Sequence, residues 1–219
     1  IEKQNEDLAK RGYRVIALAE GKVNKKQKYE DNDIKDLTFI GLVGFIDPVR
    51  PETKGSIAEC HKAGIKVIMI TGDHPLTALS IAKDINIANN LEQVATGKEV
   101  EEMFNKGEDE FDKFVKEKTV FSRVTPTDKL HIVESLKRQD EFVAVTGDGV
   151  NDSPAIKSAH IGIAMGSLGS DAAIEAADIV IMDDDIRKIS KVMQISRKTM
   201  RIVKENIVFA LGVKGAVLI

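Results

Sequence analysis

The chain has 219 residues, of which 42% are hydrophobic, so it is long enough for one large domain with a buried core, or for one domain and part of another. Its formal charge of −3 and its low aromatic content of 5% argue against a nucleic-acid partner. The single cysteine, Cys60, cannot form an internal disulfide, which excludes a disulfide-stabilised scaffold and favours a reducing compartment.

After an opening segment, residues 1–36, that contains a charged, linker-like stretch (21–36), short apolar runs alternate with helix-compatible segments. Most of the runs are continuously apolar, as the buried strands of parallel sheets usually are. The alternation therefore predicts an α/β fold, namely a Rossmann-like parallel sheet with helices on both faces. The predicted strands are 37–45, 65–70, 119–121, 142–145, 161–164 and 179–182.

Five helices are predicted between these runs. Four of them begin with proline, which suits the first helical position because its missing N–H would have no intrahelical partner there. A further stretch, residues 99–118, is rich in charged side chains and is predicted to be a solvated helical insertion without a chemical role. The five predicted helices are 51–63, 75–85, 126–138, 154–158 and 170–176.

The character of the chain changes near its C-terminus. Residues 186–206 are basic and helical in pattern, and residues 207–219 are apolar. One interpretation is an amphipathic helix packed on the domain. Basic residues typically flank the cytoplasmic side of a membrane helix, and we therefore favour a membrane entry. A full span requires ~20 apolar residues, so we expect a membrane helix that is cut off midway.

Two of the predicted strands end in polar corners that contain glycine. The run 142–145 leads into Thr-Gly-Asp-Gly-Val-Asn-Asp at 146–152, and the run 65–70 leads into Thr-Gly-Asp at 71–73. Carboxylates at the carboxyl end of a buried strand, spaced by glycines that allow close approach of the backbone, suit a Mg²⁺–phosphate site. Each corner alone could be an ordinary turn. Two such corners favour one shared catalytic edge.

Five segments, taken in their order and spacing, resemble one family closely: the P-type cation-transporting ATPases, whose phosphorylation domain belongs to the haloacid dehalogenase superfamily. The resemblance covers essentially the whole chain. It implies a haloacid dehalogenase-like fold with four parts: the end of a nucleotide-binding domain and hinge (1–36), the downstream half of the phosphorylation domain (37–185), a basic stalk helix (186–206) and the start of a transmembrane helix (207–219). The five segments are Asp-Pro-Val-Arg-Pro at 47–51, Thr-Gly-Asp at 71–73, the residues 121–129 and 146–152, and Ile-Ala-Met-Gly at 163–166.

The resemblance also implies catalytic roles for five residues. Asp148 would be the Mg²⁺ ligand, and Asn151 and Asp152 would shape the same loop. Thr71 would donate a hydrogen bond to a phosphoryl oxygen, and Lys129 would supply positive charge to the transition state. For Lys129 the alternative is a solvated helix residue.

A second implied set would contact ATP. Arg123 and Arg14 would reach the nucleotide from opposite sides of a domain cleft, while the remaining members would hold the geometry of nucleotide and domain. For Asp73 the alternative is a cap on the following helix. The whole set comprises Arg14, Asp47, Arg50, Gly72, Asp73 and Arg123.

The family's nucleophilic aspartate lies in an Asp-Lys-Thr-Gly-Thr segment, and no such segment occurs in these 219 residues. We therefore expect a fragment of an ATP-driven pump that is inactive alone. Its expected partners are Mg²⁺, ATP, membrane lipid, the transported cation and the pump's nucleotide, actuator and transmembrane domains, with this portion on the cytoplasmic face of an integral membrane protein. Nucleic acid is not expected.

The transported cation is ambiguous in the sequence. Residues 37–165 resemble the calcium and related light-cation class, which we slightly favour, whereas the pattern after Ser167 is more similar to the zinc, cadmium and lead exporters. Two other functions stay open, namely a free-standing phosphatase of the same superfamily and a non-catalytic nucleotide-binding module.

Overall fold

The structure, a computed structural model of the chain, describes residues 1–22, 30, 34–46, 48–166, 169–183 and 185–217. Contacts divide the chain into two compact units, one formed by Ile1–Val49 and Ile68–Glu141 and the other by Arg50–Val67 and Phe142–Ile219. Asp47 and most of the linker-like stretch lie outside the described residues. The division into four parts made from the sequence stays a prediction.

The first unit opens with helix α1 (Glu2–Lys10) and a two-stranded antiparallel sheet, in which β1 (Arg14–Glu20) pairs with β2 (Thr38–Phe45). The expectation that the run 37–45 belongs to a parallel sheet is therefore wrong. Its apolar sequence imitates a buried parallel strand, but many of its side chains are exposed in this two-stranded ribbon, which has too few strands to enclose a core of its own.

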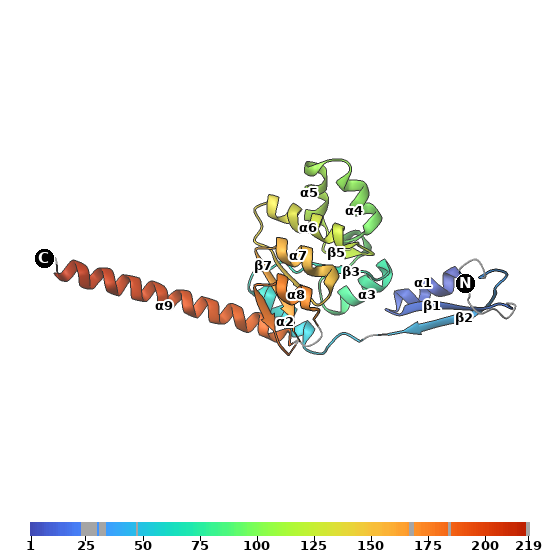
Figure 1. The fold of residues 1–219 in the computed structure, drawn as a ribbon, viewed down its shortest axis with the longest axis horizontal. Helices are drawn as coiled ribbons and strands as arrows, with labels where there is room; N and C mark the ends of the chain where they lie inside the picture. The colour runs from blue at the N-terminus through green and yellow to red at the C-terminus, as the bar shows by residue number, and fades with distance from the viewer. Residues whose placement is uncertain (23–29, 31–33, 47, 167–168, 184, 218–219) are drawn as a thin grey trace. The chain divides into compact units, whose positions relative to one another are not determined.

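The rest of the first unit is a parallel sheet of three strands in the order β3-β5-β4 with helices packed against it (Figure 1). The edge strand β4 was not predicted, because three residues are too few to show a periodic pattern. The strands are β3 (Met69–Thr71), β4 (Val94–Thr96) and β5 (Val120–Ser122). The helical elements are α3 (Pro75–Asp84), the 3-10 turn η2 (Leu91–Gln93), α4 (Gly97–Phe104), α5 (Glu108–Glu117) and α6 (Pro126–Arg138).

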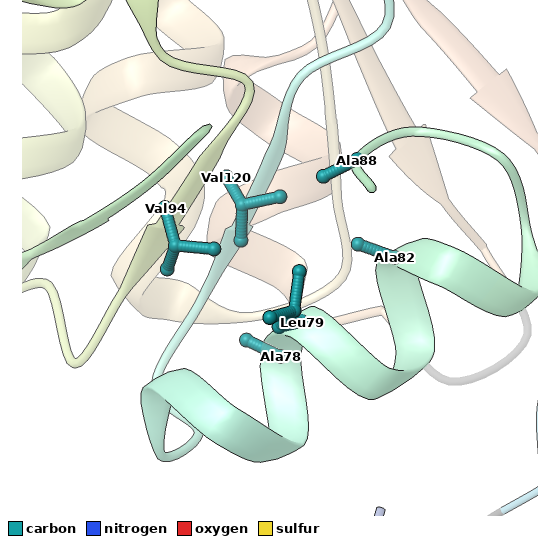
Figure 2. Close-up of a cluster of buried hydrophobic side chains, with 6 residues drawn as sticks. All are labelled: Ala78, Leu79, Ala82, Ala88, Val94 and Val120. Carbon is teal, nitrogen blue, oxygen red and sulfur yellow. The ribbon is translucent and has the colours of Figure 1, made fainter. Parts of the chain in front are cut away.

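Small residues bring α3 close to this sheet. Ala78 and Ala82 lie one helical turn apart on the inner face of α3 and are fully buried, and the neighbouring Leu79 packs with Val94 of β4 and Val120 of β5 (Figure 2). Burial of each such valine or leucine side chain contributes about 1.5–3 kcal/mol before entropy is counted. The tight packing fixes α3, and with it the corner that precedes α3.

Helices α4 and α5 belong to the core of the unit rather than to a solvated insertion. Val100, Phe111 and Val115 are fully buried, together with Phe121 of β5 and Ile132 of α6. The sequence-based prediction for 99–118 is therefore wrong for their inner faces. The many charged residues of the outer faces dominated the composition and hid an amphipathic pattern.

The second unit contains the parallel sheet β6-β7-β8, with α7 and α8 packed against β7 (Figure 1). Helix α2 (Thr53–Lys62) contacts the last helix, α9 (Arg187–Val217). The other elements are β6 (Ala144–Gly147), the 3-10 turn η3 (Val150–Asp152), α7 (Ser153–Ser158), β7 (Ile161–Met165), α8 (Asp171–Ala176) and β8 (Ile179–Ile181).

The predicted fold class, α/β with parallel sheets flanked by helices, is confirmed, with the predicted parallel strands distributed over the two units. Within the predicted run 65–70 only the last two residues are in a strand. Proline begins α3 and α6 as predicted, whereas α2 begins at Thr53, after Pro51.

Helix α9 is continuous and covers both the basic and the apolar predicted segments. Its apolar side chains Val208, Phe209 and Leu211 are 71%, 73% and 65% exposed. As far as the structure describes the chain, no helix is both long and apolar enough to cross a bilayer.

Candidate functional site

The parallel register of the first unit brings two predicted site segments to one sheet edge. Thr71, the last residue of β3, pairs with Ser122, the last residue of β5. The segments that follow these strands, Gly72-Asp73 and Arg123, therefore leave the sheet side by side at its carboxyl edge. This is the edge at which α/β proteins bind ligands.

Thr71 and Asp73 form a closed local arrangement. The Thr71 hydroxyl donates to Asp73 Oδ2 at 3.0 Å and accepts the Asp73 backbone N–H at 3.1 Å. The alternative role for Asp73, a cap on the next helix, is filled by another residue: His74 Nδ1 accepts the Leu76 N–H at 3.3 Å. Asp73 therefore orients Thr71, whose hydroxyl would have to turn from this carboxylate to donate to a bound phosphoryl oxygen.

His74 connects this corner to Arg123 electrostatically. Burial lowers the pKa of the His74 imidazole, the positive charge of Arg123 lowers it further, and Glu6 acts in the opposite direction. A neutral imidazole keeps Nδ1 available as the acceptor that caps α3. The effect on His74 also indicates that the charge of Arg123 acts at the Thr71–Asp73 corner.

Arg123 has an unusual backbone. Its φ of 52° lies in the left-handed region, which non-glycine residues rarely adopt and which is frequent at functional sites. Its carbonyl group occupies the space where a Cβ on Gly97 would lie, so glycine is required there. The next turn is a capping box in which Thr125 and Asp128 bond each other's backbone, and Lys129 follows in this first turn of α6, half-buried.

Arg14 begins β1 opposite Phe45, and its side chain is exposed. The residue before it, Tyr13, is bonded through its carbonyl to the buried Thr77 of α3, at 3.2 Å. The first unit thus connects the start of β1 to the helix that follows the Thr71–Asp73 corner.

In the second unit, β6 ends at Gly147, which pairs with Ala164 of β7, and residues 148–152 follow from this carboxyl end. The loop is fixed at two points. Asp152 Oδ2 accepts the Gly149 N–H at 3.3 Å, and the Asp148 carbonyl accepts the Ser170 N–H at 2.8 Å. A Cβ on Gly147 would lie 2.6 Å from the Asp152 Cβ, so glycine at 147 lets Asp152 fold over the loop.

The Asp148 carboxylate suits a magnesium ion. Its side chain is exposed, and within the described residues it has no hydrogen-bond or ion-pair partner, while the loop backbone around it is held. Mg²⁺ prefers oxygen ligands, keeps several waters and is commonly bound through one or two carboxylates and the phosphates of a substrate. Asp148 would hold the ion, with the half-buried Asp152 beside it. No cluster of three or more His, Cys, Asp or Glu side chains with metal-binding geometry occurs in the described part of the chain.

Arg50 belongs to the second unit, where its carbonyl accepts the Thr53 N–H at 3.0 Å in the turn before α2. Its predicted companion Asp47 lies outside the described residues.

The predicted site residues therefore form two groups. The first unit brings together Thr71, Gly72, Asp73 and Arg123 at one sheet edge, with Lys129 in the next helical turn, and the second unit joins Asp148, Asn151 and Asp152 in one loop.

The sequence analysis did not predict two positioning residues, His74 and Ser170. Ser170 directly before a helix is a recognised N-cap pattern and could have been noticed, because its Oγ accepts the Ala173 N–H. Histidine is not a typical N-cap residue, so the sequence around His74 did not indicate that it caps α3.

Comparison with known proteins gives a family and a set of relatives. A family model described as haloacid dehalogenase-like hydrolase matches residues 3–160. The "Calcium-transporting ATPase 1" of Bacillus cereus is 41% identical over 205 residues, which are 94% of this chain and 23% of that protein. The "Cation-transporting ATPase pma1" of Synechocystis sp. is 42% identical over 98% of this chain and 24% of its own length.

A human relative, "Potassium-transporting ATPase alpha chain 2", is 44% identical over 80% of this chain and 19% of its own length. The chain spans about a quarter of the length of the bacterial relatives it matches. The resemblance to P-type cation-transporting ATPases that the motifs predict is confirmed by these matches.

Proposed function

Because the chain belongs to the haloacid dehalogenase-like hydrolases, we propose that it is the phosphoryl-handling part of a P-type cation-transporting ATPase, in which Mg²⁺-dependent formation and hydrolysis of an aspartyl phosphate drives cation transport. The observation that carries the proposal is the Asp148 loop, where an exposed carboxylate projects from a backbone held by Asp152 and Ser170. A loop whose backbone is already held in this way would bind an ion with little rearrangement.

The predicted site residues would have separate roles. Thr71 would donate to a phosphoryl oxygen, Asp73 would orient Thr71, and Lys129 would place positive charge near the transferred group. Mg²⁺, held by Asp148, would neutralise charge on the phosphoryl oxygens. Arg14, Arg50, Gly72 and Arg123 would hold ATP, together with Asp47.

The parent protein would be an integral membrane protein, with these residues on the cytoplasmic face and residues 207–219 at the start of a membrane helix. Its partners would be membrane lipid, the transported cation and the other domains of the pump. The phosphorylated aspartate would come from an Asp-Lys-Thr-Gly-Thr segment outside these 219 residues, and the chain alone would be inactive.

For the cation, we propose calcium or a related light ion first and a zinc, cadmium or lead exporter as the alternative. Relatives named for calcium and for potassium match this chain at 41% and 44% identity. Because relatives named for such different cations match at nearly equal identity, we propose that the choice of ion depends on other parts of the pump.

A chimera tests the proposal. The 219 residues replace the matched segment of the Bacillus cereus calcium-transporting relative, and the chimera is incubated with radiolabelled ATP and Mg²⁺. We expect an acid-stable, hydroxylamine-sensitive phosphoenzyme. The control is the same chimera with Asp148→Ala, which should form none. A correctly inserted chimera that forms no phosphoenzyme, beside a relative that does, would contradict the proposal.

The two remaining alternatives give other results. A free-standing phosphatase would hydrolyse a generic phosphate ester as the isolated chain. A non-catalytic module would bind ATP as the isolated chain and would still fail to support phosphoenzyme formation in the chimera.

A further inference from the structure

Thr77, on α3, uses its hydroxyl to contact a segment that is distant in the sequence. A helical serine or threonine usually donates to the carbonyl three or four residues earlier. Ser56 and Ser190 do so, toward Glu52 and Arg187. The Thr77 hydroxyl instead donates at 3.2 Å to the carbonyl of Tyr13, 64 residues away in the sequence, and Thr77 is only 4% exposed.

The acceptor of this bond is well placed to influence Arg14. The Tyr13 carbonyl is part of the planar peptide group whose nitrogen belongs to Arg14, so fixing that oxygen fixes the direction in which Arg14 and β1 leave. Tyr13 is also held by its N–H, which donates to the Leu8 carbonyl at 3.1 Å, and its ring lies close to Gly44, where a Cβ would come within 3.0 Å of the ring.

The donor, Thr77, is also held firmly in place by its own helix. Thr77 lies in the first turn of α3, which His74 caps directly after the Thr71–Asp73 corner. The following residues, Ala78 and Leu79, are packed in the core. A shift of this turn would therefore move the Thr71–Asp73 corner and the start of β1 together.

We propose that Thr77 is a positioning residue for nucleotide binding, whose hydroxyl holds Arg14 at a fixed place relative to the Thr71–Asp73 corner. This inference rests on the proposed function, in which Arg14 contacts ATP. The ligand of this arrangement would be a nucleoside triphosphate, which both segments would contact.

The experiment compares the full chain with three variants by titration with ATP, followed through the backbone amide signals of Arg14 and of residues 71–73. Thr77→Val and Thr77→Ala both remove the hydroxyl, the first with similar shape and the second with high helix propensity. Thr77→Ser keeps it. Because one hydrogen bond is at stake, we expect both hydroxyl-free variants to raise the Kd for ATP about threefold to tenfold and Thr77→Ser to change it little.

A second readout separates positioning from stability. Mg²⁺-dependent binding of orthovanadate, which depends on Asp148, should be unchanged in all variants measured well below their melting temperature. If the hydroxyl-free variants fail to fold, or fold and bind ATP with the original Kd, Thr77 is structural and the inference is overturned while the proposed function stands. If ATP perturbs the corner without Arg14, the inference also falls. If the unmodified chain binds no ATP, the inference and the nucleotide part of the proposed function fall together.

Discussion

Asp148 carries the proposed metal site as a single side chain. We expect Asp148→Ala to abolish Mg²⁺-dependent binding of a phosphate analogue, because the remaining loop offers no comparable exposed carboxylate at the end of β6. The free energy of unfolding should change by less than about 0.5 kcal/mol, since this exposed side chain contributes nothing to the core. Calorimetry with and without Mg²⁺ measures the effect.

The matched control is Glu175→Ala, which removes an exposed carboxylate from α8 in the same unit. It should leave Mg²⁺ dependence intact. Unchanged Mg²⁺ dependence in Asp148→Ala would remove Asp148 from the metal site.

Gly147 gives a test of the loop geometry. In Gly147→Ala the new methyl group would lie 2.6 Å from the Asp152 Cβ and 2.7 Å from its Oδ2, so Asp152 must move. We expect weaker Mg²⁺ binding and a loss of about 1–3 kcal/mol of stability in urea unfolding. In Gly55→Ala of α2, where a Cβ meets nothing within 4 Å, alanine should stabilise the protein by up to about 1 kcal/mol. Equal stability of the two variants would show that the loop adapts without cost.

At the residue scale, the sequence predicted which strand ends carry the polar corners, because glycine and carboxylates after an apolar run are visible in one dimension. It did not predict the bond between Thr71 and Asp73, the cap by His74 or the left-handed backbone of Arg123. Arginine carries no preference for a positive φ, so only the packed structure, with Gly97 against its carbonyl, reveals that conformation.

At the scale of elements, α5 and α6 are joined by a bidentate ion pair. Arg138 donates to Asp112 through Nη2 at 2.7 Å and Nε at 3.2 Å. Burial raises the pKa of the Asp112 carboxyl, but hydrogen bonds from Arg138 and Ser135 outweigh it and hold the pKa below its ordinary value. A carboxyl whose pKa is lower in the folded protein stabilises the fold above its unfolded pKa, and this contribution disappears as the pH falls through the folded value.

We therefore expect Arg138→Met to lower the free energy of unfolding by about 1 kcal/mol at neutral pH and by less below about pH 4, where the unfolded carboxyl is already protonated. Urea unfolding across this pH range measures the difference. The control is Lys113→Met, which breaks the more exposed pair with Glu110 and should have little effect at any pH. A loss for Arg138→Met that is independent of pH would mean that its hydrocarbon packing, not the ion pair, matters.

Helices and strands were predicted correctly where a residue such as proline marks the boundary, and the incorrect predictions fall where no such residue is present. Proline marked the starts of α3 and α6 correctly, since it suits the first helical turn. The composition of 99–118 concealed Val100 and Phe111 as core residues. The run 37–45 was assigned to the wrong kind of sheet, because strand pairing depends on distant partners that apolar composition does not specify.

At the scale of the whole molecule, the C-terminal half of α9 carries several exposed apolar side chains. If residues 207–219 begin a membrane helix, the full chain should self-associate or bind detergent, because the apolar side chains around Phe209 are exposed. Deletion of 207–219 should leave a monomer by light scattering. A full-length variant with Val208→Ser and Phe209→Ser should also self-associate less than the unmodified chain. A full chain that is monomeric without detergent, and unchanged by the deletion, would favour a helix packed on the domain.

Because Gly97 contacts the Arg123 carbonyl, the effect of a substitution at either of these two positions depends on the residue at the other. A methyl group at 97 costs most when residue 123 is held in its left-handed conformation, whereas glycine at 123 could yield. The effects of Gly97→Ala and Arg123→Gly should therefore not add, with a coupling of about 0.5–3 kcal/mol in a double-mutant cycle. In relatives that lack the glycine at 97, we expect the backbone at 123 to follow a different path. The residues that are tolerated at one position therefore depend on earlier substitutions at the other.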